Sequence, residues 1–223
     1  MMTENNFFTL CQKWCGFSQN AEIPKFYRQS IDVTDKIFVP YDELESVSKS
    51  VPLEKLVPHF FIDDKKQVNF ACNPDGHSEL LDKVYAVFST DLSVFTNAYP
   101  QFNNALLLLN RLVASYWQQK DRFVVITLSW AGKETFETAF LNIEKGSVVG
   151  ISTEGVSDWI CFRNGFLEML KVVEPSVICW YGKIPEWVSG YFSTDRIIQI
   201  PKRFKIVNER RNLESKKCQY ELF

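Results

Sequence analysis

Six short apolar runs, rich in β-branched and aromatic residues, recur along the chain after residue 58. Each run is almost continuously apolar instead of alternating with polar residues, which is typical of strands that are covered on both faces of a parallel sheet. The runs are His59–Ile62, Val84–Phe88, Phe123–Leu128, Val148–Ile151, Val177–Tyr181 and Ile197–Ile200. The pattern predicts about six mostly parallel strands.

Segments with a helical spacing of apolar residues lie between these runs. They are Pro100–Gln119, Lys133–Asn142 and Phe162–Val173. Strands that alternate with helices of this length indicate βαβ units with crossover helices. Six strands are too few for a complete eight-stranded barrel. We therefore expect an α/β fold, either an open sheet or a partial TIM-like barrel.

The first fifty-eight residues follow no such rhythm. Asn6–Phe17 has the spacing of a short amphipathic helix, and Asp42–Lys49 is long enough for one or two helical turns. The pattern predicts three regions: an irregular N-terminal extension packed on the core (1–58), an α/β core domain (59–201) and a basic C-terminal tail (202–223).

Composition narrows the class of protein. Apolar residues make up 46% of the chain and charged residues 23%, as in an ordinary globular protein. The longest run of aliphatic residues, Ala105–Leu109, is too short to span a bilayer, so no membrane partner is expected. No export signal is visible. We therefore expect a cytoplasmic protein with six free thiols, at Cys11, Cys15, Cys72, Cys161, Cys179 and Cys218.

Polar residues follow the predicted strands at the points where the strands end. Because parallel strands bring their carboxyl ends to one edge, these residues are expected to share a rim where ligands bind. The same residue types also cap helices, so each one has a structural alternative. The strand-end residues are Asp63, Asp64, Thr90, Asp91, Ser93, Ser129, Trp130, Ser152, Thr153, Glu154, Gly155, Gly182 and Lys183.

Common catalytic motifs are missing from the chain. It contains no dinucleotide-binding or phosphate-binding glycine loop, no nucleophile elbow and no zinc-protease helix. The two histidines, His59 and His77, are poor candidates for a catalytic base. Four acids at the strand ends could converge on Mg²⁺, but nothing in the sequence shows that they meet, so no metal site is predicted. They are Asp63, Asp64, Asp91 and Glu154.

Several fragments resemble a family of bacterial and phage proteins classed as a domain of unknown function, the family numbered 4417. The likeness runs from about residue 59 to 182. It rests on HFFIDD at 59–64, STDLS at 89–93, ASYWQ at 114–118, ITLSW at 126–130, KGSVVGISTEG at 145–155 and Tyr181-Gly182. The resemblance implies an α/β fold common in phages and mobile elements, with no activity that can be carried over.

The resemblance singles out the same sheet edge. Its matching positions are Asp91, Ser93, Trp117, Thr127, Ser129, Trp130, Ser152, Thr153, Tyr181 and Gly182. Other members tend to have proline at the position of Thr90 and valine at that of Glu154, which weakens Glu154 as part of a shared mechanism. We predict that a small polar or nucleotide-like ligand binds there, with Asp91 either orienting the ligand or acting as a general base, the candidate catalytic residue. The predicted ligand-binding residues are Asp63, Asp91, Ser93, Trp117, Ser129, Trp130, Ser152, Thr153 and Tyr181.

Two other functions stay open. The net charge of the chain is −2, yet the segment from residue 202 to 217 contains seven basic residues and only two acidic ones. This tail suits nucleic acid, as in a replication or counter-defence protein, or it is a solvated end. The tail residues expected to contact nucleic acid are Lys202, Arg203, Lys205, Arg210 and Arg211. A non-catalytic inhibitor of a host defence complex, with a host protein as its partner, is the second alternative.

Overall fold

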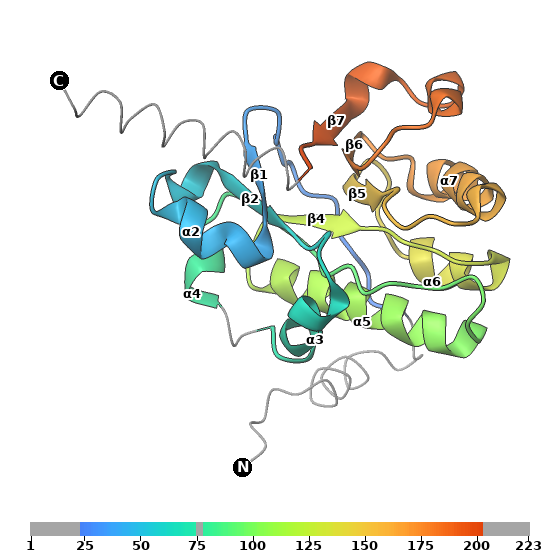
Figure 1. Ribbon diagram of the computed structural model, residues 1–223, viewed down its shortest axis with the longest axis horizontal. Coiled ribbons are helices and arrows are strands. Elements are labelled where there is room, and N and C mark those ends of the chain that lie inside the picture. The colour runs from blue at the N-terminus through green and yellow to red at the C-terminus, as the bar shows by residue number, and fades with distance from the viewer. Residues whose placement is uncertain (1–22, 75–77, 203–223) are drawn as a thin grey trace, which may run out of the picture.

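A five-stranded parallel sheet forms the centre of the protein. The computed structural model describes residues 23–74 and 78–202 (Figure 1). The strands β3 (Val87–Phe88), β4 (Val124–Thr127), β5 (Val148–Ser152), β6 (Val177–Tyr181) and β7 (Ile197–Ile200) lie side by side in the order of the sequence. All neighbouring strands are parallel, so their carboxyl ends meet at one edge.

Two more strands precede this sheet. β1 (Ile37–Pro40) and β2 (Leu56–His59) form a separate parallel pair. The pair adjoins the main sheet, because the backbone N–H of Tyr85, just before β3, donates to the carbonyl of Leu56 at 3.2 Å. The described strands therefore follow one another in space in their sequence order.

The helices connect these strands. In chain order, α5 (Pro100–Gln119) connects β3 to β4, α6 (Phe136–Phe140) connects β4 to β5, and α7 (Trp159–Val173) connects β5 to β6. α5 and α6 lie below β4 in the view of Figure 1. The shorter helices are α2 (Leu44–Ser48), α3 (Asp64–Cys72) and α4 (Ser78–Leu81). Short 3₁₀ helices are formed by Tyr41–Glu43, Leu53–Lys55, Lys133–Thr135, Glu186–Gly190 and Thr194–Arg196.

The two faces of the sheet are buried in different ways. Strand residues such as Val87, Ile126 and Trp180 pack with α5, α6 and α7 in the larger core. The opposite face carries a smaller cluster to which every strand contributes at least one buried residue: Phe38, Val57, Phe88, Val125, Val148, Cys179 and Ile200. Sequential strands with crossovers on one face are the winding of a barrel, and this sheet does not close.

Gly150 of β5 lets this inner face pack tightly. A Cβ atom at Gly150 would lie 2.4 Å from Cε1 of Phe88, too close for any side chain. Phe88 in turn meets Phe38 and Phe61 edge to face, with ring centroids 6.0 and 5.7 Å apart. Glycine at position 150 therefore leaves space for the ring of Phe88, which projects from β3 into the inner cluster.

The α/β fold and the parallel sheet are confirmed, but the start of the fold was placed wrongly. The first predicted strand, His59–Ile62, lies three residues too late, since β2 spans Leu56–His59. β1 lies in the region expected to be irregular, and β1 and β2 pair apart from the five-stranded sheet. β1 escaped notice because IFVP is only four residues long and ends in proline. The division into extension, core domain and tail stays a prediction.

The long helix is confirmed with the expected bounds, Pro100–Gln119. Its proline occupies the first turn, where no backbone N–H is needed. The segment expected as a helix over Lys133–Asn142 divides into a 3₁₀ turn and the five-residue α6. The predicted helix Asn6–Phe17 and the thiols Cys11, Cys15 and Cys218 lie outside the described residues.

The cysteines that the structure describes, Cys72, Cys161 and Cys179, are free thiols, as expected. Burial raises the pKa of Cys179 to about 12, so this thiol stays protonated. Over residues 23–74 and 78–202, no helix combines the length and the apolar character needed to cross a membrane.

Candidate functional site

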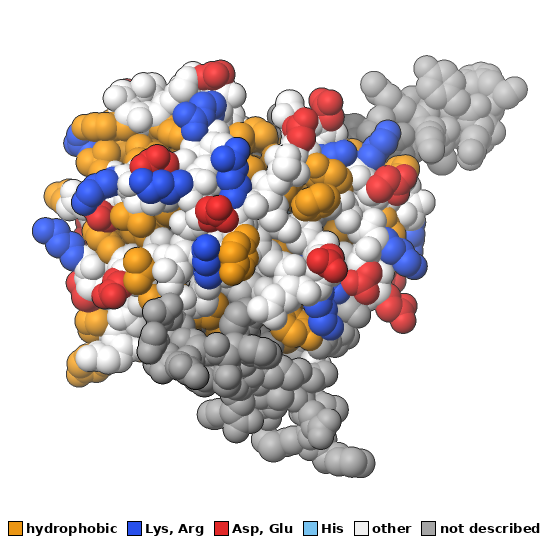
Figure 2. Space-filling view, turned by 180° about the vertical axis from the view of Figure 1, so that it is seen from behind, with side chains coloured by type: hydrophobic (Ala, Val, Ile, Leu, Met, Phe, Trp, Pro, Cys, Tyr) orange, Lys and Arg blue, Asp and Glu red, His pale blue; other side chains and the backbone are white. Residues whose placement is uncertain are grey.

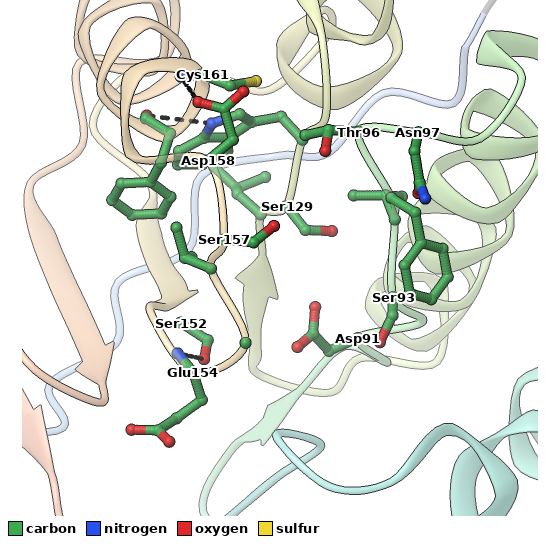
Figure 3. Close-up of a pocket in the computed structure, with 17 residues that line it drawn as sticks. Asp91, Ser93, Thr96, Asn97, Ser129, Ser152, Glu154, Ser157, Asp158 and Cys161 are labelled. Atoms are coloured by element: carbon green, nitrogen blue, oxygen red, sulfur yellow. Dashed lines mark hydrogen bonds between the residues drawn. The ribbon is translucent and has the colours of Figure 1, made fainter.

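A cleft of about 440 Å³ opens at the carboxyl ends of β3, β4 and β5. Asp91 and Ser93 reach it from the segment after β3, Ser129 from the segment after β4, and Ser152 from the end of β5 (Figure 3). The loop from Glu154 to Asp158 forms the remaining wall. The polar residues at the ends of three successive strands therefore line one cavity. Its size suits a small ligand.

Asp91 lies at the base of this cleft. Its carboxylate points into the space bounded by Ser129, Ser157 and Glu154 (Figure 3). Burial raises the pKa of Asp91 to about 7, and the negative charge of Asp64 contributes further to the rise. Close to neutral pH this carboxyl therefore exists in both protonation states, as a general acid or base requires.

The backbone of Asp91 is clamped by a buried amide. Gln67 of α3 accepts from the N–H of Asp91 with Oε1 and donates to its carbonyl with Nε2, both at 2.8 Å. The side chain of Gln67 is completely buried. The amide acts as a neighbouring strand would, and it holds Asp91 in place where no strand pairs with it.

Two asparagines of α5 repeat this device further along the same segment. Asn110 accepts from the N–H of Leu92 at 3.1 Å and donates to its carbonyl at 3.3 Å. Asn103 accepts from the N–H of Phe95 at 3.0 Å and donates to its carbonyl at 2.8 Å. Side-chain amides thus supply the hydrogen bonds that an irregular segment cannot make with itself. The segment that carries Asp91, Ser93 and Phe95 is consequently held at three points.

Ser93 is held by a carboxylate instead of an amide. Its backbone N–H and its hydroxyl both donate to Oδ1 of Asp64, at 3.2 Å. Asp64 opens α3, where a negative charge favours the helix N-terminus. The same carboxylate therefore orders Ser93 and raises the pKa of Asp91.

The β4 side of the cleft depends on Trp130. The indole N–H donates to the carbonyl of Phe162 at 3.2 Å, and the two rings stack with centroids 5.1 Å apart. Trp130 also covers Gly165 of α7, where a Cβ atom would lie 2.1 Å from the indole nitrogen. The close approach of α7 to this wall therefore requires glycine at position 165.

We expect Gly165→Ala to lower the free energy of unfolding by about 1–3 kcal/mol, the usual cost of overpacking a core. The added methyl group would push Trp130 away from Phe162. Urea denaturation monitored by tryptophan fluorescence measures the loss. Gly190→Ala is the matched control, because a Cβ atom there meets nothing within 4 Å. Equal stability of the two variants would contradict the packing that we describe.

The loop after β5 leads directly into α7. The hydroxyl of Ser152 accepts from the N–H of Glu154 at 3.1 Å. Asp158 caps α7 by accepting from the N–H of Cys161 at 2.8 Å. Glu154 forms an ion pair of 2.8 Å with Lys202, which follows β7. Both acids at this wall are thus engaged by the protein itself.

Comparison with known proteins agrees with this architecture. The family model titled "Domain of unknown function (DUF4417)" matches residues 16–200. The chain belongs to the DUF4417 family. The match includes the predicted range 59–182 and extends beyond it at both ends, so the resemblance seen in the sequence is confirmed.

Two curated relatives of this DUF4417 chain come from bacteriophages. It is 29% identical over 130 residues to the Gene 1 protein of Mycobacterium phage L5, which covers 56% of this chain and 57% of the relative. It is 28% identical over 130 residues to the Gene 1 protein of Mycobacterium phage D29, which covers 56% of this chain and 48% of the relative. The chain therefore spans about half the length of these relatives, and it is phage-associated. No solved structure matches it significantly.

The nine predicted ligand-binding residues of this DUF4417 chain divide into two groups. Five of the predicted ligand-binding residues line the cleft together: Asp91, Ser93, Ser129, Trp130 and Ser152. Trp130 faces it as a mostly buried wall residue. The other four, namely Asp63, Trp117, Thr153 and Tyr181, do not line it.

These four residues have structural environments in the DUF4417 fold. Asp63 caps α3 by accepting from the N–H of Lys65 at 2.9 Å. Trp117 is fully buried in the helix-side core. Thr153 is buried and donates to the carbonyl of Lys183 at 2.8 Å. Tyr181 stacks on Phe61 at the inner face of the sheet, with ring centroids 5.1 Å apart.

The hypothesis of a shared metal site also fails to gain support in this DUF4417 chain. Among the described residues, no group of three or more His, Cys, Asp or Glu side chains lies close enough to hold a metal ion. The four candidate acids instead have separate roles: Asp63 caps a helix, Glu154 pairs with Lys202, Asp64 holds Ser93 and Asp91 faces the cleft.

Only Lys202 of the predicted nucleic-acid-binding residues is described. Arg203, Lys205, Arg210 and Arg211 lie outside the described residues. On the face shown in Figure 2, basic and acidic side chains are interspersed, and neither sign gathers into a continuous field. The described part of that face therefore has no charge pattern that favours nucleic acid.

Sequence reasoning missed several residues of the DUF4417 cleft. Phe95, Thr96, Asn97 and Ser157 line it, as does Asp158. Asp158 carries a recognisable signal, because Ser-Asp directly before an apolar segment marks a helix start. The remaining residues belong to an irregular segment that no periodicity describes, and the structure alone places them.

Proposed function

We propose that the protein binds a small polar molecule in the strand-end cleft and that Asp91 contacts this molecule directly. One observation carries the proposal. Polar side chains from three successive strand ends surround a cavity of about 440 Å³, and no hydrogen-bond partner for the Asp91 carboxylate occurs among the described residues. A convergent polar set in a well-formed cavity is the usual form of a ligand site.

The free-energy cost of burying the Asp91 carboxyl in the cleft also supports a ligand site there. A carboxyl whose pKa is raised to about 7 by burial destabilises the folded protein whenever it is ionised. The protein nevertheless fixes this residue with the buried amide of Gln67. Costly, firmly positioned ionisable groups in clefts are characteristic of functional sites.

A ligand screen on the full-length protein tests the proposal. The probes are methyl glucoside, uridine, uridine monophosphate, spermidine and citrate, and binding is read by saturation-transfer NMR. We expect at least one probe to bind and to lose its signal when Ser129→Phe fills the cleft. Ser48→Phe is the control, because Ser48 is partly exposed at the end of α2 and does not line the cleft. Failure of all five probes, or binding that survives Ser129→Phe, contradicts the proposal.

The protonation of Asp91 makes a separate prediction about pH. Its pKa is about 7, so the carboxyl is mostly protonated at about pH 6 and mostly ionised at about pH 8. We expect the protonated form to donate a hydrogen bond, so binding weakens across this range. Asp91→Asn keeps a neutral donor and is expected to bind equally at both pH values. Wild-type binding that strengthens from pH 6 to pH 8, together with loss of binding in Asp91→Asn, would show instead that the ionised carboxylate is required.

The nucleic-acid and host-inhibitor functions stay hypotheses. The first depends on the basic tail, whose single described member, Lys202, pairs with Glu154. The second depends on no particular residue. No contact within residues 23–74 and 78–202 favours either of them over the cleft.

A further inference from the structure

Three acidic residues, Asp91, Glu154 and Asp158, line the cleft, and each of their charges is balanced. Glu154 pairs with Lys202 at 2.8 Å, and this contact raises the pKa of the lysine. Asp158 sits at the N-terminus of the fifteen-residue α7 and accepts a backbone hydrogen bond there. The helix dipole is positive at that end and favours the charge. Asp91 balances its own charge by taking up a proton near neutral pH.

No lysine or arginine side chain lines the cleft among the described residues, so nothing in its lining supplies an unpaired positive charge. Lys202 is close to the cleft, but its charge is paired with Glu154, and Lys133 lines an adjoining groove of about 320 Å³. The cleft therefore has no built-in attraction for an anion, and its compensated carboxylates leave little for a cation.

The remaining polar lining consists of hydroxyls and one amide. They come from Ser93, Thr96, Asn97, Ser129, Ser152 and Ser157. Hydroxyl and amide groups both donate and accept, and carboxylates accept strongly. A ligand that matches this set must itself carry many groups that donate and accept, without net charge.

An exposed aromatic ring stands at the edge of the cleft. Phe95 lines it and keeps 49% of its surface exposed. Its backbone is fixed by Asn103 through hydrogen bonds of 3.0 and 2.8 Å, so the residue is held at the edge of the cleft. The negative face of an aromatic ring attracts polarised C–H groups. Sugars present such groups on one face of the ring, with hydroxyls around its edge.

We infer that the ligand of this cleft is an uncharged, hydroxyl-rich ring, the sugar of a free saccharide or of a nucleoside, stacked on Phe95. The inference rests on the proposed function and adds the chemical class of the ligand. The sugar hydroxyls meet the serine, asparagine and carboxylate groups, and the phosphate of a nucleotide finds no partner in the cleft.

Titration of the full-length protein with four probes separates the classes. Methyl glucoside represents a free saccharide, uridine a nucleoside, uridine monophosphate an anion and spermidine a cation. We expect a neutral probe to bind most tightly and the monophosphate to bind no better than uridine. Binding of methyl glucoside alone identifies a saccharide, and binding of uridine alone a nucleoside.

A pair of phenylalanine variants tests the stacking surface. Phe95→Ala is expected to weaken binding of the preferred neutral probe about tenfold, the effect of losing one well-placed ring. Phe102→Ala is the matched control, because Phe102 is 54% exposed and does not line the cleft. Circular dichroism and thermal unfolding establish that both variants are folded. Equal affinities of the two variants would overturn the role of Phe95.

The outcomes distinguish this inference from the proposed function. If spermidine or the monophosphate binds most tightly and Ser129→Phe abolishes that binding, the cleft is a ligand site but its ligand is charged, so the inference alone fails. If no probe binds, both fail. Tighter binding of the monophosphate that is lost in Lys133→Ala would place the phosphate in the adjoining groove and would also overturn the inference.

Discussion

Asp91→Asn is expected to raise the free energy of unfolding above neutral pH by up to about 4 kcal/mol. The pKa of Asp91 is about 7 in the folded protein, against an ordinary value of 3.8, and each unit corresponds to about 1.4 kcal/mol. Above pH 7 the folded protein must hold an ionised carboxylate in a site that favours the neutral form. Asparagine has the same shape and carries no charge, so it removes this cost.

The pH range of the effect follows from the two pKa values. Below about pH 4 the carboxyl is protonated in both the folded and the unfolded chain, and the stabilising contribution of Asp91 is complete. This contribution is lost as the pH rises toward 7, and above that value the loss is constant. Urea denaturation at about pH 4, 6 and 8 measures it. Asp35→Asn, at an exposed position, is the control. A gain in Asp91→Asn that does not grow with pH would contradict the raised pKa.

His59→Phe is expected to stabilise the protein most in acid, by about 3 kcal/mol at pH 4. His59 is completely buried, and neither ring nitrogen has a hydrogen-bond partner among the described residues. Burial lowers its pKa from 6.5 to about 3. The unfolded chain therefore binds a proton below about pH 6.5 that the folded protein excludes, and stability falls as the pH drops from 6.5 toward 3.

Phenylalanine suits this position because His59 is surrounded by rings. Its imidazole lies 5.4 Å from both Phe61 and Tyr181 and 6.2 Å from Phe88, between ring centroids. The change removes two unpartnered polar nitrogens from the inner face and keeps the shape close. Urea denaturation between about pH 4 and 7 measures the effect. A wild-type pH profile that His59→Phe leaves unaltered would show that His59 is protonated in the folded state.

His59 and Asp91 have opposite effects on the pH dependence of stability over most of the acid range. Between about pH 4 and 6.5 the unfolded chain binds a proton at His59, and the folded chain binds one at Asp91. Because both states bind one proton, these groups together produce almost no slope of stability against pH. Each single variant should expose the slope of the other residue, of about 1.4 kcal/mol per pH unit. In the double variant the free energy of unfolding should again be nearly independent of pH over this range.

Much of the fold can be predicted from the sequence because it depends on local patterns. Five of the six predicted strands overlap β3 to β7, and Pro100–Gln119 is a helix with the expected bounds. Continuous apolar runs required coverage on both faces, and the structure supplies helices on one face and the inner cluster on the other. The first strand was misplaced because HFFI looks more strand-like than LVPH, although proline is acceptable at the end of a short strand.

The candidate site could be predicted only in part. The rule that parallel strands share one edge correctly brought Asp91, Ser129 and Ser152 together. The same rule does not say which side chains at that edge turn toward a cavity. Thr153 follows Ser152 and faces elsewhere, since successive strand residues point to opposite faces. Tyr181 is the register partner of Ser152 on β6, yet its ring packs on Phe61 in the inner cluster and not in the cleft.

The sequence by itself determined that this chain builds a parallel α/β sheet, because apolar periodicity and turn residues act over a few neighbouring positions. It also determined that polar side chains follow the strands. Only the tertiary structure decided that Gln67 clamps Asp91 across 24 residues and that Phe95 is fixed by Asn103 beside the cleft. Such contacts depend on where distant segments meet. The raised pKa of Asp91 has the same origin, since burial and the charge of Asp64 exist only once the chain has folded.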